Sequence, residues 1–416
     1  MKDKLVIIDG IRTPFCKFGT DLAALAADEL GRVAVNALLT KTGINPELID
    51  EVIFGCVSQP AESMNIARVI ALRSGIPQHV PAMTVHRNCA SSLESLTTAY
   101  ERMHAGHGNI FIVGGAESMS EVPLQFSRQA AAKFASLSKA KSLGQKLGAL
   151  AAFRPGDFSP IVALKLGLTD PFTGMGMGDT AEVLAREFNI SRAAQDAFAL
   201  QSHQRAAQAR ERFAEEITPV YIGGKAIIAD NGVRENQSMA ALSKLRPVFD
   251  RVTGSVTAGN SSQITDGAVA LLVASESAAD RLALNPLGYL TGYAYAGCDP
   301  ERMGLGPVAA LQHAKDYHGL TTEGLDLIEL NEAFAAQSLA VREQVRERQL
   351  GDFPDDKLNV NGGAIALGHP VGATGSRLVL TVLKELHRQK AKRALATLCV
   401  GGGQGAAVWL ERSAQS

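Results

Sequence analysis

The sequence predicts an α/β protein made of two similar halves, with a separate segment inserted between them. Short apolar runs rich in Val and Ile alternate with Ala- and Leu-rich helical patterns, which is typical of this fold class. The segment Asp50–Gly55 is echoed by Asp326–Asn331, and Phe111–Gly115 is echoed by Leu398–Gly402. These echoes indicate a duplicated unit. Residues 120–250 differ in residue patterning from both ends of the chain and form a candidate inserted domain.

Local patterns predict the individual elements. Three short apolar runs predict buried strands, at Leu5–Ile8, Glu51–Gly55 and Ile110–Gly114. Apolar residues at helical spacing predict helices over Asp28–Leu39 and Ser92–Met103. Ser191 is expected to cap a long helix that runs towards Phe213.

The bulk composition is that of a soluble globular protein, with 46% hydrophobic and 20% charged residues. A chain of 416 residues is too long for one ordinary core, so two or three tightly packed units are expected. Forty glycines with only 5% aromatic residues suit closely packed layers. A net charge of −1 gives no global attraction to nucleic acid or acidic membranes.

The cysteines and the termini bear on the cellular location. The five cysteines include no CxxC pair, which argues against a disulfide scaffold and against a structural zinc site, and no metal is expected. The apolar run Leu5–Ile8 is too short for a signal peptide or a membrane span. The final residues Ser-Ala-Gln-Ser differ from a Ser-Lys-Leu peroxisomal targeting signal. A reducing cytoplasm is therefore the expected location.

One part of the insert has an unusual charge pattern. Between Val122 and Gly156 there is no acidic residue, and the cations are Arg128, Lys133, Lys139, Lys141, Lys146 and Arg154. Apolar residues recur between them at helical spacing, at Phe126, Ala130, Phe134 and Leu137. Two interpretations stay open: a solvated, partly helical excursion over the functional site, or a basic amphipathic segment that touches a membrane or a partner subunit.

The first motif with reactive potential surrounds Cys89. A strand pattern precedes this residue and a helix pattern follows it, so its sulfur is expected near a helix N-terminus, where the dipole favours thiolate. An inert buried thiol is the alternative, and we favour it for Cys16, Cys56 and Cys298. Small polar neighbours distinguish Cys89 from those three.

A second motif places His369 among five glycines, in the segment Asn361–Gly375. The segment is expected to be an irregular loop that lets backbone approach a ligand. A histidine that only hydrogen-bonds within the loop is the alternative.

Two further motifs lie near the C-terminus. The glycines of Leu398–Gly405 do not predict a dinucleotide site, because about ten residues follow and cannot complete that fold. A thiol at Cys399 beside Gly401 instead offers backbone N–H groups that could face an oxyanion. In Glu329–Ala335, Asn331 or Glu332 could cap a helix, or the Asn331 amide could hold a catalytic water.

Taken together, the motifs of Cys89, His369, Cys399 and Asn331 resemble the catalytic set of the thiolase family. Further matching segments occur in family order, at Gly10–Pro14, Gly114–Met119, Val256–Ser262 and Thr265–Gly267. The resemblance implies a five-layered αβαβα fold from two duplicated halves with an inserted loop domain. It implies an N-terminal half over 1–120, completed by part of 251–280, a loop domain over the CoA site at 121–250, and a C-terminal half over 281–416.

The resemblance also implies a role for each site residue. Cys89 would attack the 3-keto carbon of a 3-ketoacyl-CoA and carry the acyl group, after His369 takes its proton. His369 and a water on Asn331 would hold the first oxyanion, and the N–H groups of Cys89 and Gly401 the second. Cys399 would protonate the departing carbanion and later deprotonate CoA. Coenzyme A is implied as a substrate, with no permanently bound cofactor.

For the CoA-binding wall the resemblance points to Ser262, Phe249, Met177, Ala333 and Phe334. Ordinary core packing is the alternative for the apolar members. Gly176 stands where many short-chain thiolases carry His, which puts the usual pantetheine contact in doubt and leaves more room.

The segments His86–Ser92 and Arg154–Phe158 resemble the thiolase subunit of the fatty-acid oxidation trifunctional complex. The implied function is 3-ketoacyl-CoA thiolysis in fatty-acid β-oxidation by ping-pong catalysis. The alternatives are a short-chain acetyl-CoA acetyltransferase, a decarboxylating ketoacyl synthase and a non-catalytic lipid-binding relative. A homodimer or dimer of dimers is implied, with a hydratase/dehydrogenase partner or a peripheral membrane contact through 122–156, and without nucleic acid.

Overall fold

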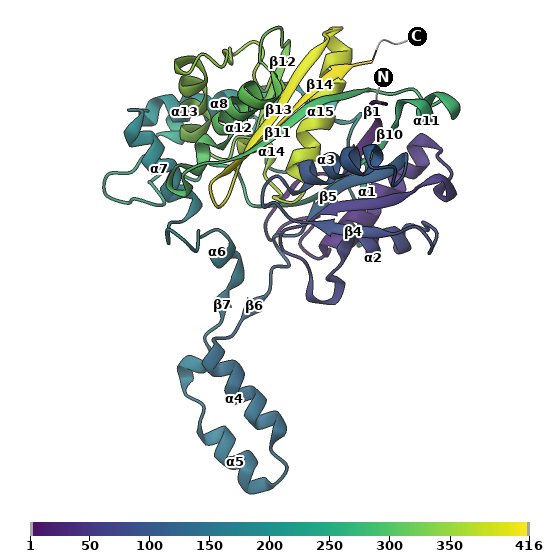
Figure 1. Cartoon of the computed structure of the whole chain (residues 1–416). Helices are drawn as coiled ribbons and strands as arrows, with labels where there is room; N and C mark the ends of the chain where they lie inside the picture. The colour runs from purple at the N-terminus through teal and green to yellow at the C-terminus, as the bar shows by residue number, and fades with distance from the viewer. Residues whose placement is uncertain (1–2, 414–416) are drawn as a thin grey trace.

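The computed structural model describes residues 3–413 and contains one large mixed sheet (Figure 1). Its strand order is β12-β13-β14-β11-β1-β10-β5-β3-β4, and the short β2 pairs with β10. The strands are β1 (Leu5–Arg12), β2 (Cys16–Lys17), β3 (Glu51–Gly55), β4 (Ala82–Val85), β5 (Ile110–Glu117), β10 (Thr265–Ser275), β11 (Gly288–Gly297), β12 (Leu327–Leu330), β13 (Arg393–Val400) and β14 (Gln404–Arg412). The two halves of the sheet meet where β1 pairs with β11 over two residue pairs.

Helices cover both halves and fill the space between them. On the N-terminal half, α1 (Ala27–Thr42) and α2 (Ile66–Arg73) form an outer layer, and α12 (Gly306–His318) does so on the C-terminal half. Between the halves, α3 (Ser91–His104) packs against α15 (Thr374–Gln389). The result is the α–β–α–β–α layering that the family resemblance implies.

Alternate residues of each strand face different cores. Leu5 and Ile7 of β1 point into the central core around α3 and α15, whereas Val6 and Ile8 point into the core beneath α1 and α2. Because both faces are buried, the strand reads as a continuous apolar run rather than an alternating one. The continuous apolar runs are therefore what makes the strands recognisable in the sequence.

The two halves share a detailed hydrogen-bonding pattern, which supports the duplication. Asp50, just before β3, accepts from the backbone N–H groups of Asn109 (2.7 Å) and Ile110 (2.9 Å). In the other half Asp326, just before β12, accepts from those of Lys392 (2.7 Å) and Arg393 (2.9 Å). In both halves the strand after this Asp runs parallel to its neighbour.

The predicted elements are found, with small differences at their ends. The strand at Glu51–Gly55 is confirmed as predicted, and the other two runs are the first parts of longer strands, β1 and β5. Both predicted helices are confirmed as α1 and α3. Ser191 caps α8 (Arg192–Gln208), accepting from the N–H of Ala194. That helix stops before Phe213, which lies in the separate α9 (Arg210–Phe213).

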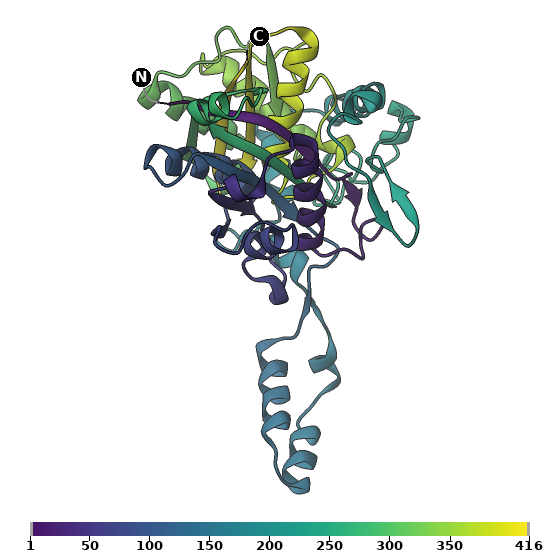
Figure 2. The ribbon, with the colours of Figure 1, turned by 90° about the vertical axis from the view of Figure 1, so that its right-hand side faces the viewer.

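The basic segment projects from the layered body instead of covering it (Figures 1 and 2). Its base is closed where β6 (Leu124–Gln125) pairs with β7 (Ile161–Val162), and its tip consists of α4 (Arg128–Lys139) and α5 (Leu143–Ala151). We call residues 124–162 the hairpin. Phe134 packs against Phe126, Phe153 and Phe158, with ring centroids 5.1, 4.9 and 6.2 Å apart. The segment is solvated and partly helical, as the first interpretation expects, but it does not lie over the body as that interpretation also expects (Figure 1).

The rest of the insert returns to the body. It contains α6 (Ala163–Gly167), α7 (Met177–Glu187), α8, α9, β8 (Val220–Ile222), β9 (Lys225–Ile227) and α10 (Met239–Leu242). Residues 1–2 and 414–416, including most of the terminal Ser-Ala-Gln-Ser, lie outside the described residues. Within residues 3–413, no helix is both long and apolar enough to cross a membrane.

Candidate active site

Cys89 lies in the tight connection between β4 and α3. The preceding Asn88 adopts a left-handed backbone conformation (φ +42°), which Asn tolerates better than most residues. Its side-chain amide donates to the carbonyl of Gly401 at 2.7 Å. The connection therefore places the Cys89 thiol two residues before the start of α3 and ties it to the β13–β14 turn.

The turn between β13 and β14 brings the Cys399 thiol close to the Cys89 thiol. Residues 401–403 connect β13 to β14, and positive φ values of +87° and +76° at Gly402 and Gly403 explain the need for glycine there. The backbone N–H of Gly401 lies near enough to Cys89 to act on the pKa of its thiol, which it lowers. Cys399, buried near the end of β13, lies close enough for the charge of Cys89 to raise its pKa.

His369 lies between α14 (Ala364–Leu367) and α15 and is buried. Its Nδ1 is 2.6 Å from the hydroxyl of Thr374, which donates to the carbonyl of Pro370 at 3.0 Å. Because Thr374 uses its proton there, Nδ1 must be the protonated nitrogen, and Nε2 carries a free lone pair. Nε2 has no hydrogen-bond partner among residues 3–413. The glycine-rich segment is less irregular than predicted, because it includes the helical turn α14.

Asn331 follows β12 directly and is completely buried. Its backbone N–H donates to Thr397, but both side-chain polar atoms lack partners within the described part of the chain. An unpaired buried amide is costly, so a water or substrate atom is expected beside it. Glu332 instead accepts from Ser202 (2.6 Å), and α13 (Ala335–Glu347) has no side-chain cap. The interpretation of Asn331 or Glu332 as a helix cap is therefore wrong.

Burial controls the electrostatics of the three reactive groups. It raises the pKa of Cys89, although the N–H of Gly401 opposes this effect, and it also raises the pKa of Cys399. The Cys89 thiol lies near the N-terminus of α3, as predicted, but burial gives it a raised pKa rather than the lowered one expected from the helix terminus alone. Burial, together with the Arg377 cation, lowers the pKa of His369 to about 3. Cys89 and Cys399 are therefore protonated thiols, and the neutral His369 imidazole is able to accept a proton.

A cavity of about 760 Å³ opens onto the Cys89 thiol. Of the predicted site residues, it is lined by Cys89, Met177 and Gly401. Sequence reasoning missed other lining residues: Val57, Ser58, Met119, the α6 segment, Phe172 and Val371. Some signal was present, since Val57 and Ser58 follow a predicted strand and Met119 ends a family motif. Val371 also connects this cavity to the loop that carries His369.

The predicted CoA-wall residues gather beside the cavity. Met177 packs against a cluster that contains Ala333, Phe334 and Cys399. The backbone N–H of Ser262 donates to Ala333 at 2.9 Å, and the rings of Phe249 and Phe334 meet edge to face at 6.1 Å. Only Met177 of these five lines the cavity itself.

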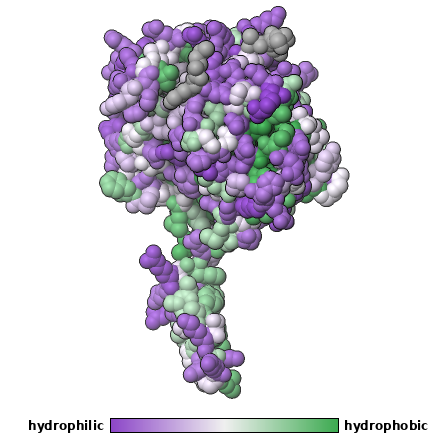
Figure 3. Space-filling model, turned by 45° about the vertical axis from the view of Figure 1, so that its right-hand side comes forward, coloured by the Kyte–Doolittle hydropathy of each residue, from purple (hydrophilic) through white to green (hydrophobic). Residues whose placement is uncertain are grey.

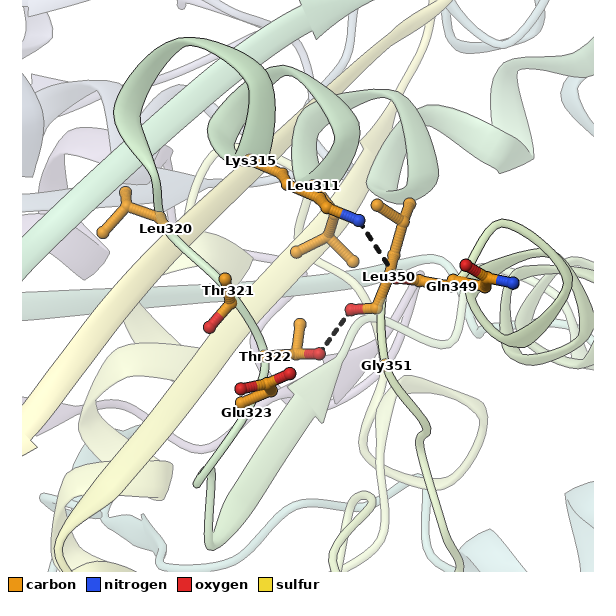
Figure 4. Close-up of a pocket in the computed structure, with 9 residues that line it drawn as sticks. All are labelled: Leu311, Lys315, Leu320, Thr321, Thr322, Glu323, Gln349, Leu350 and Gly351. Atoms are coloured by element: carbon orange, nitrogen blue, oxygen red, sulfur yellow. Dashed lines mark hydrogen bonds between the residues drawn. The ribbon is translucent and has the colours of Figure 1, made fainter.

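A smaller hollow of about 240 Å³ lies between α12 and residues 349–351 (Figure 4). Hydrogen bonds cross it from Lys315 to the carbonyl of Gln349 (3.3 Å) and from Thr322 to that of Leu350. Its lining includes no thiol or imidazole and none of the predicted site residues. We therefore assign the chemistry to the cavity at Cys89.

Comparison with known families agrees with this geometry. The family model described as "Thiolase, N-terminal domain" matches residues 5–277, and that described as "Thiolase, C-terminal domain" matches residues 284–412. The chain belongs to the thiolase family.

Relatives of this thiolase match it over nearly its whole length. It is 43% identical to proteins named 3-ketoacyl-CoA thiolase from Yersinia pestis and Yersinia pseudotuberculosis, covering 98% of this chain and 97% of theirs. The human mitochondrial 3-ketoacyl-CoA thiolase in complex with CoA is 36% identical with a TM-score of 0.87, covering 99% of this chain and 98% of that one. The Bacillus anthracis acetyl-CoA acetyltransferase is 32% identical with a TM-score of 0.88, covering 99% of each chain.

Proposed function

We propose that this thiolase cleaves 3-ketoacyl-CoA with CoA to give acetyl-CoA and an acyl-CoA two carbons shorter. The observation that carries the proposal is the Cys89 thiol at the cavity, with the buried Cys399 thiol close enough to feel its charge and a neutral imidazole in the adjoining loop. The names of the Yersinia and human relatives support the same activity. In this proposal the role of the chain is thiolysis in fatty-acid β-oxidation.

In the first half-reaction, Nε2 of His369 takes the Cys89 proton as the sulfur attacks the 3-keto carbon. The imidazolium and a water on the Asn331 amide then donate to the oxyanion, in keeping with the lack of partners for His369 Nε2 and the Asn331 amide among residues 3–413. Collapse breaks the bond between the α-carbon and the keto carbon. Cys399 gives its proton to the departing α-carbon, which yields acetyl-CoA and acyl-Cys89.

In the second half-reaction, the Cys399 thiolate takes the proton of an incoming CoA thiol. The CoA sulfur attacks the Cys89 thioester, whose oxygen accepts from the N–H groups of Cys89 and Gly401. Collapse releases acyl-CoA, and His369 returns its proton to Cys89. Two thiols are needed because the acyl carrier and the proton donor act at different carbon atoms.

We further propose how the chain divides this work. Residues 1–120 with part of 251–280, and residues 281–416, act as the two halves that supply the reactive groups. Residues 121–250 act as the loop domain over the CoA site, and the wall of that site combines Met177 and Phe249 of the loop domain with Ser262, Ala333 and Phe334 from the two halves. CoA is a substrate in this scheme, and no permanently bound group is needed.

Chain-length profiling tests the proposed substrate class. The cavity of about 760 Å³ favours medium or long substrates. We expect kcat/KM for thiolysis of 3-ketodecanoyl-CoA to exceed that for acetoacetyl-CoA by at least about tenfold, since each buried methylene contributes to binding. Activity confined to acetoacetyl-CoA would assign the chain to the short-chain acetyltransferases. Release of CO2 from a malonyl thioester would instead indicate a decarboxylating synthase.

We also propose that the hairpin touches an anionic membrane surface. On α5, Leu143, Leu147 and Leu150 lie on one helical face and are 74%, 58% and 53% exposed. The one acidic residue of the hairpin, Asp157, is buried and paired with Lys133 (2.6 Å). Its exposed charges are therefore all positive, beside the apolar surface visible in Figure 3. Apolar area together with cations is the combination that anionic lipid binds.

Vesicle sedimentation tests this contact. We expect wild type to sediment with phosphatidylglycerol-containing vesicles but not with neutral ones. Reversing Lys139, Lys141 and Lys146 to Glu should weaken binding by roughly 100-fold or more, because each cation contributes about 1 kcal/mol. Changing Leu143, Leu147 and Leu150 to Ser should also weaken it, whereas Leu48→Ser with Leu72→Ser, exposed leucines on the body, should not.

Thiolysis should be unaffected in all these variants, because the hairpin lies apart from the Cys89 cavity. Failure of wild type to sediment with either vesicle at low salt would overturn the membrane contact. Hairpin-dependent capture of a hydratase/dehydrogenase subunit would then assign the surface to that partner.

We place the enzyme in a reducing cytoplasm, where its thiols stay reduced. We propose a homodimer or dimer of dimers, because β4 ends the sheet and leaves strand-edge groups that a second copy could pair. Sedimentation velocity would test this assembly, and a monomer at micromolar concentration would contradict it.

A further inference from the structure

Glu117 is a buried carboxylate that the proposed chemistry does not use. It ends β5 and is completely inaccessible to solvent. Its oxygens accept from the backbone N–H groups of Ser58 (2.8 Å), Gly372 (2.9 Å) and Val57 (3.0 Å). The thiol of Cys56 lies 3.8 Å from the same carboxylate. Three backbone donors on one carboxylate is a specific arrangement, since charge-assisted bonds are the stronger ones.

These donors belong to segments that form the active site. Val57 and Ser58 line the cavity at Cys89. Gly372 follows Val371, another lining residue, in the loop that carries His369. The loop backbone at Gly372 packs tightly against the end of β5. A Cβ on Gly372 would lie 2.7 Å from a Glu117 oxygen, and a Cβ on Gly115 would lie 1.9 Å from the Gly372 carbonyl oxygen. Glu117 therefore joins the cavity wall to the His369 loop.

The charge of Glu117 also acts on the nucleophile. Burial raises the pKa of Glu117 to about 7, although the three N–H donors oppose the rise, so the group is largely ionised at pH 8. Its negative charge contributes to raising the pKa of Cys89. Cys56, just after β3, contacts the Glu117 carboxylate, Cys89 before α3 feels its charge, and the neutral His369 lies in the loop to which Glu117 bonds.

We propose that Glu117 is a positioning residue of this active site, whose carboxylate holds the His369 loop and the Val57–Ser58 wall in register with Cys89. It acts through the backbone of these loops and does not touch substrate. The proposal rests on the proposed function, because it takes Cys89 as the nucleophile and His369 as its base.

Two substitutions separate the positioning role of the Glu117 carboxylate from the effect of its charge on Cys89. Glu117→Gln removes the charge and replaces one acceptor oxygen by a donor, so the iodoacetamide titration midpoint of Cys89 should move to lower pH. Glu117→Asp keeps the charge but shortens the reach, so that midpoint should stay while kcat falls about tenfold. In both variants KM should change less than about threefold, because Glu117 bonds to none of the proposed CoA-wall residues.

The matched control is Glu51→Gln, which removes a buried carboxylate from the start of β3, far along the strand from the cavity. It should alter neither the Cys89 midpoint nor kcat. The proposal is overturned if Glu117→Gln leaves the Cys89 midpoint unchanged, or if Glu117→Asp retains wild-type kcat. Should the Gln variant not fold, the Asp variant decides alone. Because alkylation requires no substrate, the midpoint result stands even if the proposed acyl-CoA substrate is wrong.

Discussion

Replacing Cys89 by serine is expected to lower kcat for thiolysis by at least about 10⁴-fold. The substitution is nearly isosteric, so the cavity and the Gly401 turn should persist. A hydroxyl is much harder to deprotonate than a thiol, and neutral His369, with its pKa near 3, is too weak a base to compensate. Steady-state thiolysis with CD and thermal unfolding as fold checks would measure the effect.

The matched control is Cys298→Ser, since Cys298 is also half-buried but does not line the Cys89 cavity. It should retain kcat within about twofold of wild type, because neither half-reaction uses it. A Cys89→Ser enzyme with more than about a hundredth of wild-type kcat would exclude Cys89 as the acyl carrier.

Cys399→Ser should lower kcat for thiolysis by about 10³-fold, the typical loss on removing a general acid–base group. The departing α-carbon needs a proton and the incoming CoA needs a base, and a buried hydroxyl supplies neither well. Cys89 should still be alkylated by iodoacetamide, because its base is His369. The combination of lost turnover and retained alkylation is the expected signature.

Deuterium exchange at the α-carbon of acetyl-CoA measures proton transfer by Cys399 independently of turnover. Wild type incubated with acetyl-CoA in D2O should exchange the α-protons, and the Cys399→Ser variant should not. Retained exchange in the variant would show that another group transfers this proton. Loss of Cys89 alkylation in the same variant would show that the substitution disturbs the whole site.

Much of the fold could be predicted because burial on both faces makes the strands continuous apolar runs. Glu51–Gly55 is found at its predicted limits, and the Ser191 cap marks the start of α8. The duplication was visible because Asp50 and Asp326 make the same pair of backbone hydrogen bonds. The course of the hairpin was not predictable, because it depends on the two-residue pairing of β6 with β7.

The site was predictable only in part, for reasons of burial and distance along the chain. The helix terminus before α3 suggested an acidic thiol, but tertiary burial raises the pKa of Cys89 and is not a property of the local sequence. Glu117 likewise contacts Gly372 across 255 positions, which local patterning cannot reveal. The sequence left Asn331 open as a helix cap or as an amide that holds a water, because its burial and its unpaired side chain depend on the tertiary structure.

The central claim is that one sulfur, that of Cys89, carries the acyl group between the two half-reactions. Mass spectrometry of the enzyme incubated with 3-ketodecanoyl-CoA, without free CoA, tests it most directly. We expect one octanoyl group on the peptide that contains Cys89, with acetyl-CoA released, and loss of the adduct when CoA is added. An octanoyl group on Cys399, or turnover without any acylated cysteine, would contradict the account.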